Sequence, residues 1–519
     1  MKQQALLQRW LKMPKILYFI FVLGILIRFL NFPDNINFAY DQARDSFASL
    51  DILKGDFKII GPPTTASDKI FHGALFYYIL APIYFFSGNS PEVAAAFLRI
   101  LNASGVFLVF YIGSLVFNRS VGLISAFLFA ISYEQSQYAI FFGHPSPAAI
   151  SILIYYLGLA LLIFKNNPYG LVISLIGLGL TIQFEDVNAL LLLSFTAYLL
   201  FFYKKLKFLN LKIIILGLGG FLITISSFIL VELKYNFRTI DAIIDTAQSF
   251  DSGSSVNLSY VFSVIQRLIH DNFFANDLAA NFLIILFLLT FIFLAYIKKF
   301  RNIDFFLGFW FLGGLLPHFL ATKFSYYYSP GATVSLLILV SFLIFSRSLP
   351  RIIVRGSNTI LFGLIIAVIT FSNLNLILNQ NSKGVNSDFV IQPGMILGNQ
   401  KKALDYIYGE ASGEPFAVNA LTVPLNVKTT WDFLFNWYGK EKYKSIPVWY
   451  GNVAEGFYGE LPKISSRSDV PKSQFLIIEP TVGIDEAVVN NFLKEENYFT
   501  KVMSEKTFGT IIVQKREKY

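Results

Sequence analysis

A short segment after the first apolar run gathers three ionisable side chains within little more than one helical turn. Asp41, Arg44 and Asp45 stand at positions i, i+3 and i+4, where the side chains of a helix lie close together. A carboxylate held there could act as a general base, kept ionised by the guanidinium. The commoner role of such an Asp is to cap a helix and join a surface ion pair, which contributes under about 1 kcal/mol.

The apolar residues of the same segment indicate how these charges are positioned. Ala43, Phe47, Leu50 and Leu53 recur at helical spacing. We therefore expect an amphipathic helix lying on the membrane surface, with Asp41 in or near its first turn.

Further side chains suited to chemistry occur in separate segments that the topology below assigns to one side of a membrane. Carboxylates could supply a base, and Arg or Lys could donate charge-assisted hydrogen bonds to a phosphate. Taken singly, each has an ordinary explanation, because lone bases reach towards lipid headgroups, His side chains hydrogen-bond at the interface, and Tyr residues gather there. The candidates are Lys69, His72, Arg99, His144, Glu185, Asp186, Lys323 and Tyr327.

The composition places the chain in a membrane. Of 519 residues, 55% are hydrophobic and 14% are charged, whereas soluble domains are about 25% charged. The mean hydropathy is +0.57. The net charge of +9 comes from short basic clusters between apolar runs, which fits membrane topology and predicts no nucleic-acid partner. Cysteine is absent, which excludes disulfides and thiolate metal sites.

About eleven apolar runs are long enough to be read as membrane spans, which need roughly 17–25 residues. If the marginal run 71–88 does not cross and the N-terminus is cytoplasmic, the later basic clusters all fall inside, as the positive-inside rule requires. We therefore expect 71–88 to be a re-entrant or interfacial helix in a first outer loop, 33–92. The predicted spans are 14–32, 94–117, 120–138, 147–164, 169–184, 187–203, 211–231, 281–297, 303–320, 326–346 and 357–377.

The chain changes character near residue 379, where charged residues and prolines return. Segments 416–423, 475–478 and 510–515 read as strands and 485–495 as a short helix. The predicted fold is thus an all-α polytopic membrane domain, 1–378, followed by a small α/β domain, 379–519, on the extracytoplasmic side. We expect the protein in the plasma membrane.

The order of features resembles the GT-C superfamily of membrane glycosyltransferases, in particular the bacterial relatives of protein O-mannosyltransferases and the lipid A aminoarabinose transferase. The resemblance covers most of 14–345. It rests on order and topology, because no single motif is specific. The matching segments are Tyr40-Asp41-Gln42, His72-Gly73-Ala74-Leu75, 96–100, 117–123, 131–133, His144-Pro145, 179–183 and Tyr327-Tyr328-Ser329-Pro330.

The resemblance implies transfer of a pentosyl or hexosyl group from a polyprenyl-phosphate carrier to a lipid, glycan or protein acceptor outside the membrane, with inversion. It implies Asp41 as the general base. Lys69, Arg99 and Lys323 would then hold the donor phosphate. Substrate contacts would come from the remaining candidates, Arg44, Asp45, His72, His144, Glu185, Asp186 and Tyr327.

The chain departs from the family at two positions that bear on metal binding and on the acceptor. Gln42 follows Asp41 where many relatives have Glu, and Glu185 stands where many have His. These departures leave the acceptor and metal dependence open, although a divalent metal remains compatible. Two other classes of function remain as alternatives: a polytopic transporter or lipid flippase, and a non-catalytic cell-envelope assembly protein.

Overall fold

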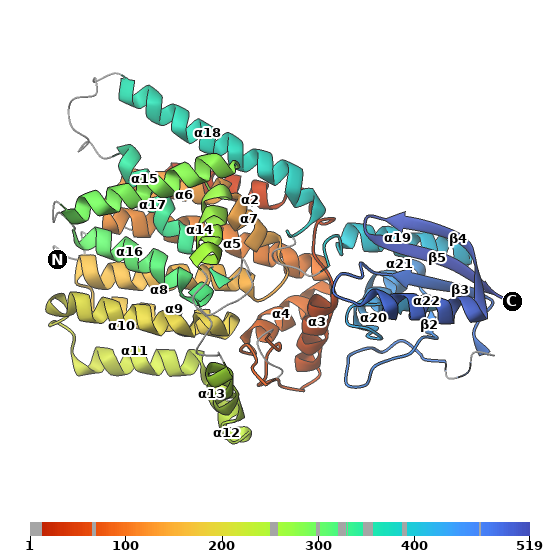
Figure 1. Cartoon of the computed structure of the whole chain (residues 1–519). Coiled ribbons are helices and arrows are strands. Elements are labelled where there is room, and N and C mark those ends of the chain that lie inside the picture. Colours follow the sequence, from red (N-terminus) through yellow and green to blue (C-terminus); the bar gives the residue numbers. More distant parts are fainter. Residues whose placement is uncertain are drawn as a thin grey trace.

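The computed structural model describes residues 13–64, 69–249, 258–296, 301–319, 328–329, 331–345, 357–386, 392–464, 466 and 469–519. A bundle of helices forms most of the molecule. A small sheet domain lies against one end of the bundle (Figure 1).

Each of the eleven predicted spans coincides, in whole or in part, with a helix or with two consecutive helices. The elements are α2 (Lys15–Arg28), α5 (Pro91–Val116), α6 (Arg119–Ile131), α7 (Tyr133–Ile140), α8 (Pro145–Lys165), α9 (Tyr169–Phe184), η1 (Asp186–Leu190), α10 (Leu191–Phe202), η2 (Tyr203–Lys205), α11 (Leu211–Thr224), α12 (Ser226–Lys234), α13 (Arg238–Ser249), α14 (Leu258–His270), α15 (Asp277–Tyr296), α16 (Asn302–Leu315), η3 (Leu316–Phe319), α17 (Ala332–Phe345) and α18 (Ser357–Gln380).

Fewer helices meet a strict criterion for crossing a membrane. Among the described residues, four are long and apolar enough, or five if α11 and α12 form one span bent by 63°. Interruptions of the helices explain part of the difference between eleven predicted spans and these counts. The predicted span 120–138, for example, is split at Ser132, whose Oγ accepts a hydrogen bond from Gln135 N (3.1 Å) and so starts a new helix.

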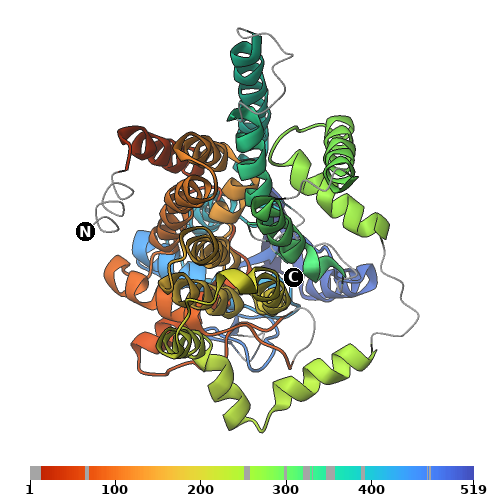
Figure 2. The ribbon, with the colours of Figure 1, turned by 90° about the vertical axis from the view of Figure 1, so that its left-hand side faces the viewer.

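The helices pack lengthwise around one apolar core. Helix α8 lies along α9, α5 packs against α6 and α8, and α2 packs against α5 and α6. Tyr156 of α8 stacks on Trp310 of α16 with ring centroids 4.0 Å apart. Seen along the bundle, α12 and α13 lie outside it (Figure 2).

The first outer loop forms two helices, α3 (Tyr40–Leu53) and α4 (Leu75–Ser87), which pack together. Helix α3 begins at the predicted place: Gln42 Oε1 accepts a hydrogen bond from Ala39 N (3.0 Å) at its N-terminus. Helix α4 has 13 residues and contains Pro82. At about 1.5 Å per residue it is about 20 Å long, and the expectation that 71–88 does not cross the membrane stays a prediction.

The C-terminal part folds around a five-stranded sheet of order β2-β1-β3-β5-β4. Strand β1 runs parallel to β2 and β3, whereas β5 is antiparallel to β3 and β4. The predicted strands and helix correspond to β1, β3, β5 and α22; β2 and β4 were not predicted. The elements are η5 (Asn381–Lys383), α19 (Leu397–Ala411), β1 (Phe416–Leu421), α20 (Thr429–Leu434), η6 (Phe435–Gly439), α21 (Lys440–Tyr443), β2 (Val448–Trp449), β3 (Ser473–Ile478), α22 (Glu486–Phe499), β4 (Thr500–Phe508) and β5 (Ile511–Lys518).

Backbone hydrogen bonds join the start of the first outer loop to the start of the sheet domain. Residues 34–38 lie beside 395–398, and Asn37 and Ile396 form an antiparallel bridge. The bonds run from Phe38 N to Met395 O (2.9 Å), from Leu397 N to Ile36 O (2.9 Å) and from Gly398 N to Asp34 O (3.0 Å).

One apolar core extends across this junction. Phe433 of α20 packs with its ring centroid 5.2 Å from that of Phe38, 5.4 Å from Phe47 of α3 and 6.4 Å from Tyr84 of α4. All four side chains are buried. The sheet domain therefore helps to hold α3 in place.

Replacing Phe433 tests this shared core. Because Phe433→Ala leaves a cavity that the surroundings fill only partly, we expect it to destabilise the protein by about 3–5 kcal/mol. The melting temperature of the detergent-solubilised protein measures the effect. Tyr498→Ala, on a side chain of the same domain that is 79% exposed, is the control. Equal melting of the two variants would contradict a shared core.

Candidate active site

Arg44 holds the two carboxylates of α3 that the sequence singles out. Its Nη1 lies 2.7 Å from Asp41 Oδ1 and its Nη2 lies 2.8 Å from Asp45 Oδ1. The two carboxylates differ in access: the Asp41 side chain is 65% exposed, whereas that of Asp45 is 3% exposed. Only Asp41 of this pair can meet a substrate directly, while Asp45 anchors the guanidinium from inside.

Burial and charge act against each other in this triad. Burial raises the pKa of Asp45 above its ordinary value, and Arg44 offsets part of that shift. Burial would lower the pKa of Arg44, but Asp45 and Asp41 raise it well above its usual value. Arg44 therefore stays charged.

A second polar cluster comes from three separate segments. His72 precedes α4, His144 stands at the N-terminus of α8, and Glu185 follows α9. Their metal-ligating atoms, one from each residue, all lie within 4.8 Å of one another. Asp186 adjoins them, with Oδ1 2.9 Å from His72 Nδ1. Burial would lower the pKa of His72, but Glu185 and Asp186 raise it to about 9.

Backbone hydrogen bonds fix the loop that carries His72. His72 N donates to Pro62 O (2.9 Å), and Gly73 N donates to Gln183 O (2.9 Å) at the end of α9. The approach requires glycine, because a Cβ at Gly73 would lie 1.7 Å from Gln183 Oε1. The segment His72-Gly73 and the segment Gln183-Phe184-Glu185 are thus parts of one contact.

The triad of α3 and the histidine cluster lie close enough to interact electrostatically. Burial raises the pKa of Asp45, and His144 lowers it by a smaller amount. Burial acts to lower the pKa of His72, and Arg44 adds to that lowering. The structure thus brings together Asp41, Arg44, Asp45, His72, His144, Glu185 and Asp186. Their chemical roles stay predictions.

The predicted phosphate-binding residues are placed differently from one another. Lys69 is exposed, in the loop just before His72. Lys323 and Tyr327 lie outside the described residues. Arg99 is fully buried: its Nη1 donates to Arg28 O and its Nη2 to Asn35 Oδ1, both at 2.8 Å. These contacts hold the start of the outer loop, and the phosphate-binding role expected for Arg99 stays a prediction.

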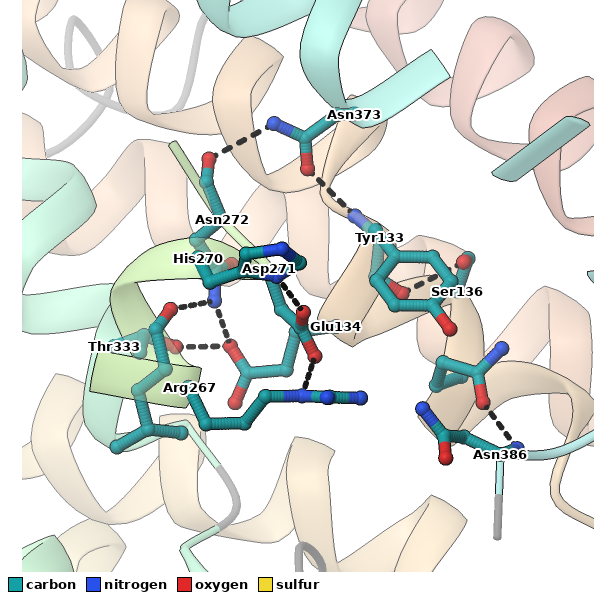
Figure 3. A network of polar contacts seen from close by, with 12 residues as sticks. Tyr133, Glu134, Ser136, Arg267, His270, Asp271, Asn272, Thr333, Asn373 and Asn386 are labelled. Atoms are coloured by element: carbon teal, nitrogen blue, oxygen red, sulfur yellow. Dashed lines mark hydrogen bonds and ion pairs between the residues drawn. The ribbon is translucent and has the colours of Figure 1, made fainter. Parts of the chain in front are cut away.

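A further polar network surrounds Glu134, an ionisable residue near the outer end of a predicted span whose partners were not predicted (Figure 3). Glu134 is fully buried, and its Oε2 accepts hydrogen bonds from Asn272 Nδ2 (2.6 Å) and Thr333 Oγ1. Beside it, Asp271 Oδ2 accepts a hydrogen bond from Arg267 Nε (2.8 Å), and Asp271 Oδ1 lies 2.7 Å from His270 Nδ1. Three consecutive polar residues, 270–272, at the end of the amphipathic helix α14 are the sequence feature that could have indicated this network.

Comparison with known proteins finds likeness in structure alone. No family model and no curated protein matches the sequence. The structure of ArnT from Cupriavidus metallidurans bound to undecaprenyl phosphate matches with a TM-score of 0.59, at 12% identity, over 96% of this chain and 97% of that one. The apo state of the same protein gives the same values.

A second solved structure is more distant. The oligosaccharyltransferase AglB from Archaeoglobus fulgidus, in complex with an inhibitory peptide and a dolichol-phosphate, has a TM-score of 0.46 at 14% identity, over 83% of this chain and 64% of that one. That score is too low to carry an argument. The match to ArnT bears out the predicted resemblance at the level of the fold: nearly the whole chain shares the fold of ArnT.

Proposed function

We propose that this protein is a membrane glycosyltransferase that moves a sugar from a polyprenyl-phosphate carrier to an acceptor on the outer side of the membrane. The observation that carries the proposal is the triad of α3. An exposed carboxylate, Asp41, is paired with a guanidinium that a buried carboxylate holds in place. The fold shared with ArnT, a protein crystallised with undecaprenyl phosphate, supports the choice of donor.

The reaction is a single displacement at the anomeric carbon. The acceptor hydroxyl oxygen forms a bond to that carbon while the bond to the phosphate oxygen breaks. Asp41 takes the hydroxyl proton, and the lipid phosphate leaves with the electron pair of the broken bond. Attack opposite the leaving group inverts the configuration, as in inverting glycoside hydrolysis.

Positive groups around the site would favour departure of the phosphate. Lys69 is the predicted phosphate-binding residue whose placement on an exposed loop beside the histidine cluster suits that task. Its charge would stabilise the leaving group as negative charge develops there. Lys323 remains a further proposed phosphate ligand, and Tyr327 a further substrate contact. Outside the cell, the acceptor would be a lipid, a glycan or a protein.

Asp41→Asn separates catalysis from a structural role of the ion pair with Arg44. Asn cannot accept the proton, whereas loss of an exposed ion pair costs under about 1 kcal/mol of stability. Because general-base catalysis contributes about 10²–10⁴-fold, we expect the rate of sugar transfer to fall by that factor while donor binding and melting temperature stay near wild type.

A matched control lies on the same helix. Asp51 is paired with Lys58 Nζ at 3.0 Å, and Asp51→Asn should leave transfer near the wild-type rate. Mass spectrometry of cell-surface glycans in a deletion strain, complemented with each variant, reads the outcome. Transfer by Asp41→Asn at close to the wild-type rate would leave the residue with its ion pair to Arg44 alone and direct attention to Asp45 and Glu185.

Lys69 and Arg99 should behave differently when each loses its charge. Lys69→Gln should raise the KM for the lipid donor roughly threefold to tenfold, with the melting temperature unchanged, because an exposed charge contributes modestly. Arg99→Gln should lower the melting temperature, because each buried acceptor left unpaired costs about 1–3 kcal/mol.

Donor kinetics and thermal melting of both variants decide between these expectations. A stable Arg99→Gln protein with a raised donor KM would restore the phosphate-binding role that the sequence suggested. Unchanged donor kinetics in Lys69→Gln would make that residue an ordinary surface lysine.

A further inference from the structure

We propose that His72, His144 and Glu185 form a binding site for one transition-metal ion of the Zn²⁺ type. Two imidazoles and one carboxylate make a set of nitrogen and oxygen donors that suits Zn²⁺. Ca²⁺ and Mg²⁺ prefer oxygen donors alone. The proposal rests on coordination geometry and does not require the proposed transferase function.

The distances inside the cluster fit metal ligands better than hydrogen-bond partners. His144 Nδ1 lies 3.4 Å from Glu185 Oε2, and His72 Nδ1 lies 3.8 Å from Glu185 Oε1. Good hydrogen bonds between nitrogen and oxygen are about 2.7–3.2 Å long. In a tetrahedral zinc site with bonds of about 2.0–2.1 Å, neighbouring donor atoms are about 3.4 Å apart. A small movement of His72 would complete that geometry.

Glu185 is the strongest sign that a cation belongs here. Its side chain is 1% exposed, and Oε2 has no hydrogen-bond partner within the described part of the chain. A buried carboxylate oxygen without a partner is costly, and a metal ion would offset that cost directly.

The surroundings hold the three ligands before any ion arrives. The hydrogen bonds of His72 and Gly73 tie one ligand's loop to the end of α9, next to Glu185. The same Nδ1 atoms also contact other oxygens: Phe184 O lies 2.7 Å from His144 Nδ1, and Asp186 Oδ1 lies 2.9 Å from His72 Nδ1. An ion bound at Nδ1 would replace the hydrogen atom in these contacts, and Asp186 lies close enough to offer it a further oxygen. Asp186 is 27% exposed, so the cluster reaches solvent on that side and an ion has a way in.

The competing explanation is a cluster held together by protons alone. A protonated His72 between Glu185 and Asp186 would balance part of their charge without any metal. The two explanations predict different results when Zn²⁺ is added. A metal site binds Zn²⁺ stoichiometrically and loses it to a chelator, whereas a cluster held by protons alone does not.

The test uses the full-length protein in detergent, stripped with EDTA and then titrated with Zn²⁺. We expect one Zn²⁺ per chain by elemental analysis and calorimetry, and a higher melting temperature when it is bound. His72→Gln, His144→Gln and Glu185→Gln should each abolish binding. Asp186→Asn, which removes a carboxylate next to His72, should weaken binding without abolishing it.

The chain supplies its own controls, because it contains four histidines. His270 and His318 lie in other contacts, with Asp271 and Ser329 respectively. His270→Gln and His318→Gln should bind Zn²⁺ as wild type does. Wild-type protein that binds no Zn²⁺ above background, or ligand variants that bind it undiminished, would overturn the proposal.

A measurement on wild-type protein covers the case in which a ligand variant fails to fold. Co²⁺ added to the stripped protein should give the intense visible absorption of a four-coordinate site, and Zn²⁺ should displace it. Weak absorption typical of six-coordinate Co²⁺ would contradict the proposed ligand set. Failure of every metal test would leave the Asp41 experiment, and with it the proposed transferase function, unaffected.

Discussion

The arrangement of the site depends on residues 34–38, which contact both the helix bundle and the sheet domain. On one side, the buried Arg99 binds Asn35 and ties the chain to the helix bundle. On the other, 34–38 lie hydrogen-bonded beside 395–398 of the sheet domain. Helix α3 begins directly after this segment. Its charged residues are therefore placed by bundle and sheet domain together, and neither part alone fixes them.

Charge balance is the second constraint on this site. Four carboxylates, from Asp41, Asp45, Glu185 and Asp186, lie near one guanidinium and two imidazoles. A phosphate-bearing donor would meet repulsion from such a surface unless further positive charge were present. The exposed Lys69 reduces that repulsion, and so does either a protonated His72 or a divalent cation bound in its place. The proposed metal site and the proposed donor are thus chemically compatible, although each is tested separately.

Much of the local structure could be predicted from the sequence, because it depends on local patterns. Helices occupy the apolar runs, and the spacing of Ala43, Phe47 and Leu50 predicted α3. Three of the residues predicted to share one side of the membrane, His72, His144 and Glu185, lie together. Their placement on the outer side stays a prediction.

Contacts between distant segments could not be predicted in the same way. Nothing near Arg99 in the sequence indicates that Asn35 will take its guanidinium, since the residues meet only through tertiary packing. The pairing of 34–38 with 395–398 involves too few residues to leave a strand-like pattern. The same holds for Glu134, whose partners Asn272 and Thr333 come from remote segments of the chain.

The link between the first outer loop and the sheet domain also has a consequence for biosynthesis. Phe38 and Gln400, which are hydrogen-bonded in the folded protein, are separated by 362 residues. At about 5–20 residues per second, the ribosome needs roughly tens of seconds to make that stretch. Throughout that time Phe38 and Phe47 lack the aromatic ring that later covers them. The segment with the candidate base is thus among the first to leave the ribosome and among the last to reach its final place.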